Sequence, residues 1–103
     1  MVIVHSHNGV PIRLTVERWQ HIGRRHPEME TLKEQVLETV SKPDLVQEGD
    51  QGELLAIRLV PKTPLTRKYL VVVYRETGVQ DGFILTAYLT SRPSAGRNAL
   101  WKR

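Results

Sequence analysis

Two short apolar runs at the start of the chain flank a turn signal. Residues 2–4 and 10–14 are rich in valine, isoleucine and leucine, and Asn8-Gly9 lies between them. Asn-Gly is among the strongest signals for a tight hairpin turn. Pro11 has no backbone N–H, so we expect the second strand at a sheet edge. The pattern predicts an N-terminal β-hairpin.

The apolar spacing then changes to a helical one. Thr15 is a good N-cap, and Glu17 lies favourably in the first turn of the helix that follows. Pro27 disfavours helical geometry in the preceding residue, which predicts that this helix ends by His26.

Residues 28–40 predict a second helix. Thr31 and Glu34 have the spacing of a capping box. One face carries apolar residues at helical spacing, namely Met29, Leu32, Val36, Leu37 and Val40. Pro43 follows as a stop signal.

From residue 45 the pattern becomes that of β-strands. Turn-rich segments separate four apolar runs, at 45–47, 54–60, 69–75 and 83–89. The tail at 93–103 reads as irregular and basic. We therefore expect a single α+β domain over 1–103, with its core at about 12–92. Its fold is predicted to be an N-terminal hairpin or strand and two helices packed on a four-stranded antiparallel sheet.

Composition narrows the class of protein. The 103 residues are 40% hydrophobic and 25% charged, as in ordinary globular domains. The absence of cysteine excludes disulfides, thiolate catalysis and cysteine-type zinc sites. No apolar run has membrane-spanning length, and the N-terminal segment turns polar too soon for a signal peptide, so we expect a cytoplasmic protein with no membrane partner. The net charge of +4 mildly favours polyanionic partners.

The first predicted helix is the most unusual segment. It contains two histidines and three arginines, with Glu17 as its single acid. At about 100° per residue, Arg18, His21 and Arg25 share one face. His26 lies at the helix end, near the core edge. Such a stripe favours an anionic partner, phosphate above all, although a solvated basic helix is the simpler alternative.

The last predicted strand carries a row of hydroxyl groups. Thr86, Tyr88 and Thr90 alternate with apolar residues, and Ile84 has the same parity as the hydroxyl row. Such a row on an open sheet face can hold a phosphate and orient a base. The alternative is that threonine and tyrosine are simply good strand residues.

Cations in the preceding strands could complete such a site. Arg58 interrupts the apolar run 54–60 and faces the same way as Leu54 and Val60. Beside the hydroxyl row it would stabilise charge on a reacting phosphate, whereas a surface charge is the alternative interpretation. Arg67 and Lys68 could also stabilise charge on the phosphate.

Other kinds of chemistry lack support. His5 and His7 form a His-x-His pair, but nearby acids and cysteines are absent, so we expect no metal site. The sequence contains no nucleophile elbow, glycine-rich phosphate loop or paired-carboxylate motif. We expect no cofactor.

Four motifs in this order resemble a known group of proteins. They are His-Ile-x-x-Arg-His-Pro-Glu at 21–28, Pro-Asp-x-Val at 43–46, Lys-Tyr-Leu-Val-Val-Val at 68–73 and Ile-Leu-Thr-Ala-Tyr at 84–88. Together they are similar to the barnase–EndoU–colicin–RelE superfamily, and most to its phage-associated small nuclease branch. The resemblance covers roughly residues 12–92.

This resemblance implies a metal-independent endoribonuclease of toxin or phage type, in which the RNA 2′-hydroxyl attacks the neighbouring phosphate. It implies RNA as substrate, with transfer RNA as a candidate, and an antitoxin or immunity protein as partner. The residues it assigns to catalysis are His21 or His26 as acid or base, Arg58 or Lys68 for charge stabilisation, and Thr86 and Tyr88 for positioning the phosphate. Substrate binding would fall to Arg18, Arg25, Lys68 and Thr90.

One departure keeps a second interpretation open. No histidine follows His26, whereas EndoU-like enzymes have histidines well separated in sequence. The alternative is a non-catalytic nucleic-acid-binding or protein-interaction domain on the same fold.

Overall fold

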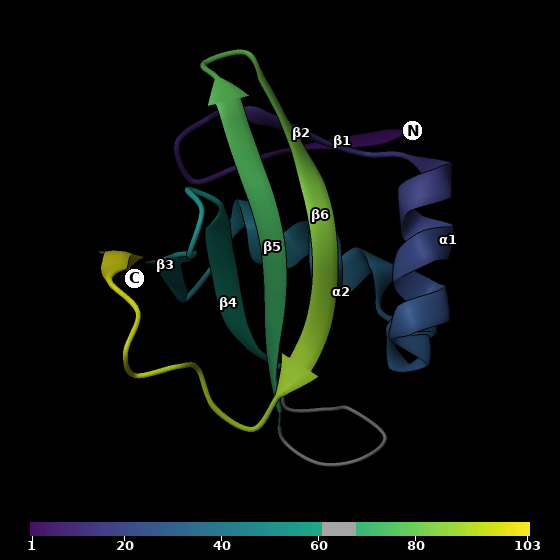
Figure 1. The fold of residues 1–103 in the computed structure, drawn as a ribbon. Helices are drawn as coiled ribbons and strands as arrows, with labels where there is room; N and C mark the ends of the chain where they lie inside the picture. The colour runs from purple at the N-terminus through teal and green to yellow at the C-terminus, as the bar shows by residue number, and fades with distance from the viewer. Residues whose placement is uncertain (61–67) are drawn as a thin grey trace.

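The computed structural model describes residues 1–60 and 68–103, which form one seven-stranded sheet, two α-helices and one 3-10 helix (Figure 1). In chain order the elements are β1 (Val2–His5), β2 (Pro11–Leu14), α1 (Val16–Arg25), η1 (Pro27–Thr31), α2 (Lys33–Ser41), β3 (Leu45–Glu48), β4 (Leu54–Val60), β5 (Lys68–Gly78), β6 (Asp81–Thr90) and β7 (Ala99–Lys102). The loop predicted at 61–67, with Arg67, lies outside the described residues.

The sheet is larger than the sequence predicts, and it is mixed. Its strand order is β1-β2-β6-β5-β4-β3-β7, and β2 runs parallel to β6 while every other pair is antiparallel. The predicted four-stranded antiparallel sheet is therefore wrong. The four predicted strands are present as β3 to β6, but the N-terminal hairpin extends the sheet at one edge and the tail adds β7 at the other.

The hairpin turns as its sequence predicts. Gly9 has φ +79°, a conformation that favours glycine, and the Ser6 N–H donates to the carbonyl of Val10 at 2.9 Å. The expectation that β2 is an edge strand is wrong. Pro11 is tolerated because it pairs with β1 only, and the contact with β6 occurs further along, where Arg13 lies opposite Phe83.

Helix α1 begins and ends where the sequence predicts. The Thr15 hydroxyl accepts a hydrogen bond from the Arg18 N–H at 3.1 Å, which makes Thr15 the N-cap. His26 is the C-cap, and Pro27 directly after it begins η1.

The single second helix predicted at 28–40 is wrong, because the structure divides this segment into η1 and α2. Leu32 stands at the N-cap of α2 without a side-chain capping bond, so the predicted capping box does not form. Met29 of η1 is fully buried, and Leu32, at the junction of η1 and α2, is 5% exposed. The apolar face predicted for this segment is therefore kept although the helix is divided.

The helices cover one face of the sheet, which we call the helix-covered face. Ile22 of α1 and Val36 and Val40 of α2 are fully buried there against β2, β4, β5 and β6. A second, smaller cluster of Leu55, Ile57 and Val71 lies on the opposite face, which we call the open face. Strand β5 is consequently apolar on both sides, as its sequence predicts.

A bulge in β6 changes which of its residues share a face. Val73 pairs with Thr86 and Tyr74 pairs with Ile84, so Leu85 is an extra residue in the ladder. Ile84 and Ala87 are both buried in the main core. The predicted parity of Ile84 with the hydroxyl row is therefore wrong, whereas Thr86, Tyr88 and Thr90 keep their common face.

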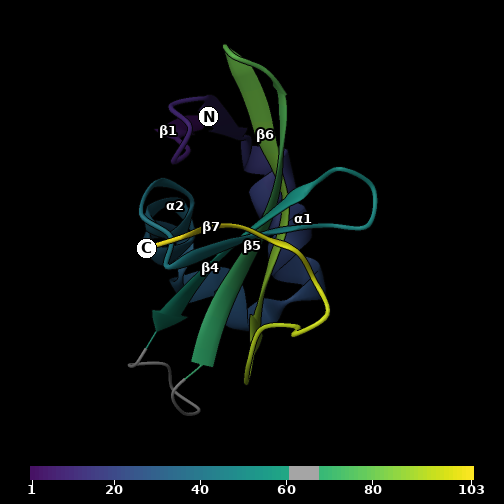
Figure 2. The same cartoon turned by 90° about the vertical axis from the view of Figure 1, so that its left-hand side faces the viewer.

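The sheet curls around α2, which Figure 2 shows nearly end-on between β1 and β7. The His7 ring, in the β1–β2 loop, lies 5.3 Å from the Trp101 ring of β7, measured between centroids. The two ends of the sheet therefore approach each other. Within residues 1–60 and 68–103, no helix is long and apolar enough to cross a bilayer.

Candidate functional site

The C-terminal tail crosses the open face and encloses a recess. Figure 1 shows this segment leaving the end of β6 and running to the C-terminus beside β3, at the opposite edge of the sheet, where β7 pairs with β3. Between the tail and the sheet lies a recess of about 220 Å³, which we call the tail recess. It is lined by Gln47, Leu55, Ile57, Val71, Tyr88, Thr90, Arg92, Pro93, Ser94 and Arg97.

Hydrogen bonds hold the tail in this position. The Thr90 hydroxyl donates to the Arg92 carbonyl at 3.0 Å, and the Gln47 side-chain amide donates to the Ser94 carbonyl at 2.8 Å. Further along, Arg97 Nη1 lies 2.9 Å from Asp50 Oδ1. The tail is thus fastened to β6 and to β3 with the residues after it, and Arg92 and Arg97 line a recess of mixed polar and apolar character.

His26 approaches this region from the end of α1. Its ring lies 6.0 Å from the Tyr88 ring, measured between centroids, with 35° between the planes. Its Nδ1 is 3.8 Å from Glu28 Oε2, and about a third of the side chain is exposed to solvent. Tyr88 lines the tail recess as well, so it contacts the imidazole and also forms part of the recess.

The structure therefore brings four predicted residues toward one region. Tyr88 and Thr90 line the recess, His26 contacts Tyr88, and Thr86 lies on the same face of β6. One histidine, one phenol and two threonine hydroxyls thus approach the open face, where they can accept, donate or orient protons near a bound phosphate.

Arg58 and Lys68 do not join this group. Arg58 pairs with Leu70 and Lys68 pairs with Val60, which places both on the helix-covered face. There Arg58 Nη1 forms an ion pair with Glu38 of α2 at 3.0 Å. The expectation that Arg58 or Lys68 stands beside the hydroxyl row is wrong, because the row lies on the opposite face of the sheet.

The cationic stripe of α1 also lies apart from the recess. His21 lines a shallow hollow on the outer side of α1 with Arg18 and Arg24, and Arg25 is exposed. Arg18 Nη1 donates to the carbonyl of Leu85 at 3.4 Å, so this side chain connects α1 to the bulge of β6. The two histidines do not share a site.

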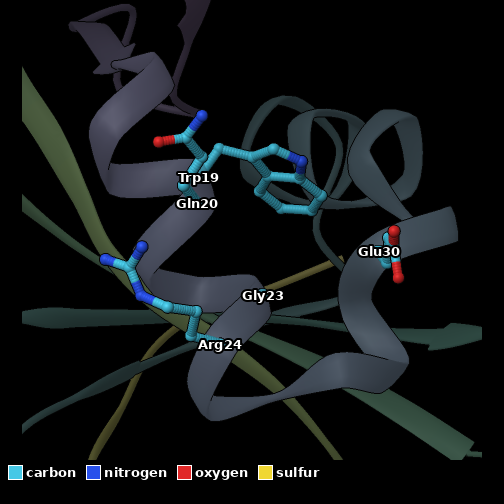
Figure 3. Close-up of a pocket in the computed structure, with 5 residues that line it drawn as sticks. All are labelled: Trp19, Gln20, Gly23, Arg24 and Glu30. Carbon is cyan, nitrogen blue, oxygen red and sulfur yellow. The ribbon is translucent and has the colours of Figure 1, made fainter.

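A larger hollow of about 600 Å³ lies between α1 and η1 (Figure 3). Trp19 projects across it toward η1, with Glu30 on the far side, whereas Arg24 points away from Glu30. Its lining residues, which also include Gln20 and Gly23, carry no imidazole or hydroxyl group. The hollow therefore offers less acid–base chemistry than the tail recess does.

The predicted histidine pair at the N-terminus is divided. His5 ends β1, while His7 lies in the following loop and packs on Trp101. Among the described residues, no group of three or more histidine, aspartate or glutamate side chains is arranged to hold a metal ion.

Sequence reasoning missed three residues of the recess, namely Gln47, Arg92 and Arg97. A weak signal exists for Arg92, because it continues the alternation of Tyr88 and Thr90 beyond the strand end. Gln47 follows the apolar residues Leu45 and Val46 of β3, and it is only 5% exposed. Arg97 has no comparable signal, since the path of the tail determines its position.

Comparison of the chain with known family models, with curated proteins and with solved structures finds no match in any of the three. The resemblance of its motifs to the barnase–EndoU–colicin–RelE superfamily stays a prediction.

Proposed function

We propose that this chain is a metal-independent endoribonuclease that acts on the open face of its sheet. The observation that carries the proposal is the contact of His26 with Tyr88, which in turn lines a recess beside Arg92 and Arg97. An imidazole and a phenol can transfer protons, and guanidinium groups can stabilise charge on the phosphate, which is the chemistry that cleavage of a phosphodiester without a metal requires.

The reaction would form a bond between the RNA 2′-oxygen and phosphorus and break the bond between phosphorus and the 5′-oxygen. His26 would take the proton of the attacking 2′-hydroxyl, and Tyr88 would donate a proton to the departing 5′-oxygen. The products are a 2′,3′-cyclic phosphate and a 5′-hydroxyl. The base role is given to His26 because an imidazole can accept a proton near neutral pH, and the acid role to Tyr88 because its phenol carries a proton to donate.

Charge on the reacting phosphate would be stabilised by the tail. Arg97 already pairs with Asp50, which compensates part of its charge, whereas Arg92 is exposed beside the recess. Arg92 is therefore the better candidate for this role, in place of Arg58. Guanidinium groups bind phosphate oxygens in a planar, bidentate geometry that suits the task.

A second candidate function is nucleic-acid binding without turnover. It is favoured by the separation of His21 from the recess, which leaves His26 as the one histidine of α1 and its C-cap that approaches the recess. The net charge of +4 and the arginines of the tail would support such binding by themselves.

Two further proposals follow from RNA as the substrate. The site of action would be the cytoplasm, and an enzyme of this kind would need an inhibitory partner. We expect that an antitoxin or immunity protein would cover the open face with acidic groups, because the recess rim carries two arginines.

The experiment is incubation of the full chain with total transfer RNA in EDTA, followed by analysis of the cut ends. We expect fragments that carry 2′,3′-cyclic phosphates. RNA that is bound but stays intact would support the second candidate, and RNA that is neither bound nor cut would contradict both.

A further inference from the structure

Gln47 has a buried amide oxygen without a hydrogen bond. The side chain is 5% exposed, and its Nε2 donates to the Ser94 carbonyl at 2.8 Å. Because only the NH₂ group can donate, this bond fixes the orientation of the amide. Oε1 is left as the acceptor, and no donor in the described part of the chain reaches it. A buried acceptor without a donor is costly for a fold, which suggests that a ligand supplies the donor.

The surroundings of Gln47 suit a flat aromatic ring. Leu55, Ile57 and Val71 supply apolar surface, and Tyr88 supplies an aromatic wall. Nucleobases that are not paired commonly stack on such aromatic side chains. The recess of about 220 Å³ is smaller than the roughly 300–1,000 Å³ of sites for drug-sized ligands, so it suits one base rather than a whole nucleotide. The phosphate would then lie outside, toward Arg92 and Arg97.

We propose that the tail recess is a base-binding subsite in which Gln47 Oε1 accepts a hydrogen bond from the exocyclic amino group of adenine, guanine or cytosine. An amino group projects from the ring, and because Oε1 is covered in the free structure, the Gln47 side chain or the tail has to shift to admit it. Uracil has no exocyclic amino group, and its N3–H lies between two carbonyl oxygens. These oxygens carry the same partial charge as Oε1 and would repel it, so uracil should bind less well. The subsite takes its role from the proposed RNA cleavage, but its binding of a base requires no turnover.

The test uses pairs of nucleotides that differ at the amino group. Guanosine and inosine 3′-monophosphate, adenosine and purine riboside 3′-monophosphate, and cytidine and uridine 3′-monophosphate are titrated into the full chain by calorimetry. In at least one pair the amino-bearing nucleotide should bind about tenfold more tightly, which corresponds to about 1.4 kcal/mol. That ratio should fall to about one in Gln47→Met. It should persist in Gln35→Met, a matched change of an exposed glutamine on α2.

Two results would overturn the subsite. One is an absence of discrimination in all three pairs, and the other is a preference that Gln47→Met leaves intact. Because Gln47→Met also removes the bond to Ser94, the wild-type protein supplies a second readout by NMR. The side-chain amide of Gln47 and the backbone amides of Ser94 and Val71 should shift when the preferred nucleotide binds, and shifts confined to other residues would contradict the proposal.

The outcomes separate this inference from the proposed function. Nucleotide discrimination that depends on Gln47, together with uncut transfer RNA, would leave the subsite standing and reject the endoribonuclease. Cleavage of RNA without any preference among the nucleotide pairs would support the endoribonuclease and reject the subsite.

Discussion

Tyr88 connects the two parts of the proposed site. Its ring contacts the imidazole of His26, and the same residue lines the tail recess. Val71, its neighbour on β5, belongs to the floor of the recess. Tyr88 would therefore link proton transfer, which involves His26, to nucleobase binding, which involves Gln47.

Arg92 is expected to contribute to phosphate binding. Arg92→Ala should weaken RNA binding and reduce the slope of log K against log salt by about one, because one phosphate contact is lost. The measurement is fluorescence anisotropy of a labelled single-stranded RNA across a salt series. Arg103→Ala, which makes the same charge change at a residue paired with Asp44 outside the recess, is the control. Equal slopes for the two variants would argue against a specific role for Arg92.

The Tyr74 hydroxyl is a second buried group without a hydrogen bond in the described part of the chain. Burial, with the nearby negative charge of Glu76 as a smaller cause, raises the pKa of Tyr74 above its usual value. The folded state therefore holds this proton more firmly than the unfolded state does. Below about pH 10 the hydroxyl is protonated in both states, so the free energy of unfolding is unaffected. Above that pH the unfolded state loses this proton first, and the free energy of unfolding declines.

Tyr74→Phe removes the unpaired hydroxyl and keeps the ring. It should raise the free energy of unfolding by about 1 kcal/mol at neutral pH, because a buried group without a partner is lost. It should also reduce the alkaline decline, as urea unfolding at neutral pH and at about pH 11 would reveal. Tyr69→Phe, at a half-buried tyrosine of the same strand, is the comparison. A less stable Tyr74→Phe protein with an unchanged alkaline decline would contradict this account.

At the residue level, the sequence predicts those parts of the site that follow from alternation along one strand. Tyr88 and Thr90 share a face because they are two residues apart beyond the bulge. The position of Arg58 relative to them depends on how two strands align, and single-strand alternation cannot supply that register. Gln47 escaped prediction because its role depends on a tail that is remote in sequence.

At the scale of elements, the path of the tail depends on β7. This strand pairs with β3, with Leu45 opposite Lys102 and Val46 opposite Trp101, and the Glu48 N–H donates to the Asn98 carbonyl at 2.9 Å. The tail is therefore anchored at both ends, by β6 and by β7. Residues 99–102 lack the alternation of a strand, and they adopt strand geometry because β3 offers an unpaired edge.

Deletion of residues 99–103 should loosen the tail without unfolding the domain, because the main core lies between the helices and the other strands. RNA affinity should fall about tenfold, the effect of losing roughly 1.4 kcal/mol of binding free energy. The exposed edge of β3 should promote self-association. Circular dichroism measures whether the fold is kept, gel filtration measures self-association, and RNA titration measures affinity. Arg103→Ala is the control that keeps β7. Unchanged RNA affinity in the deletion variant would show that tail order is irrelevant to binding.

Helix prediction succeeded where local signals act alone and failed where packing decides. Thr15 and Pro27 define α1 by hydrogen bonding and backbone geometry, and both signals are local. The division between η1 and α2 has no such local signal, because the capping-box spacing of Thr31 and Glu34 favours a helix start that the structure does not use.

At the scale of the whole molecule, the two faces of the sheet have different roles. Both helices pack on one face and build the main core, while the open face carries the recess and receives the tail. The two added sheet ends, at the hairpin and at β7, approach each other through His7 and Trp101. The sequence predicts the α+β class and the central strands. It does not predict the seven-stranded mixed sheet, because pairing between distant segments determines the sheet edges.

The most direct test of the account compares His26→Ala with His21→Ala in the transfer RNA assay with EDTA. Both variants remove one histidine from α1 or its C-cap, but only His26 contacts Tyr88. With folding verified by circular dichroism, His26→Ala should lower the cleavage rate at least about 100-fold, because general acid–base catalysis contributes roughly that much. His21→Ala should stay close to the wild-type rate. A wild-type rate in His26→Ala, or an equal loss in both variants, would contradict the proposed site.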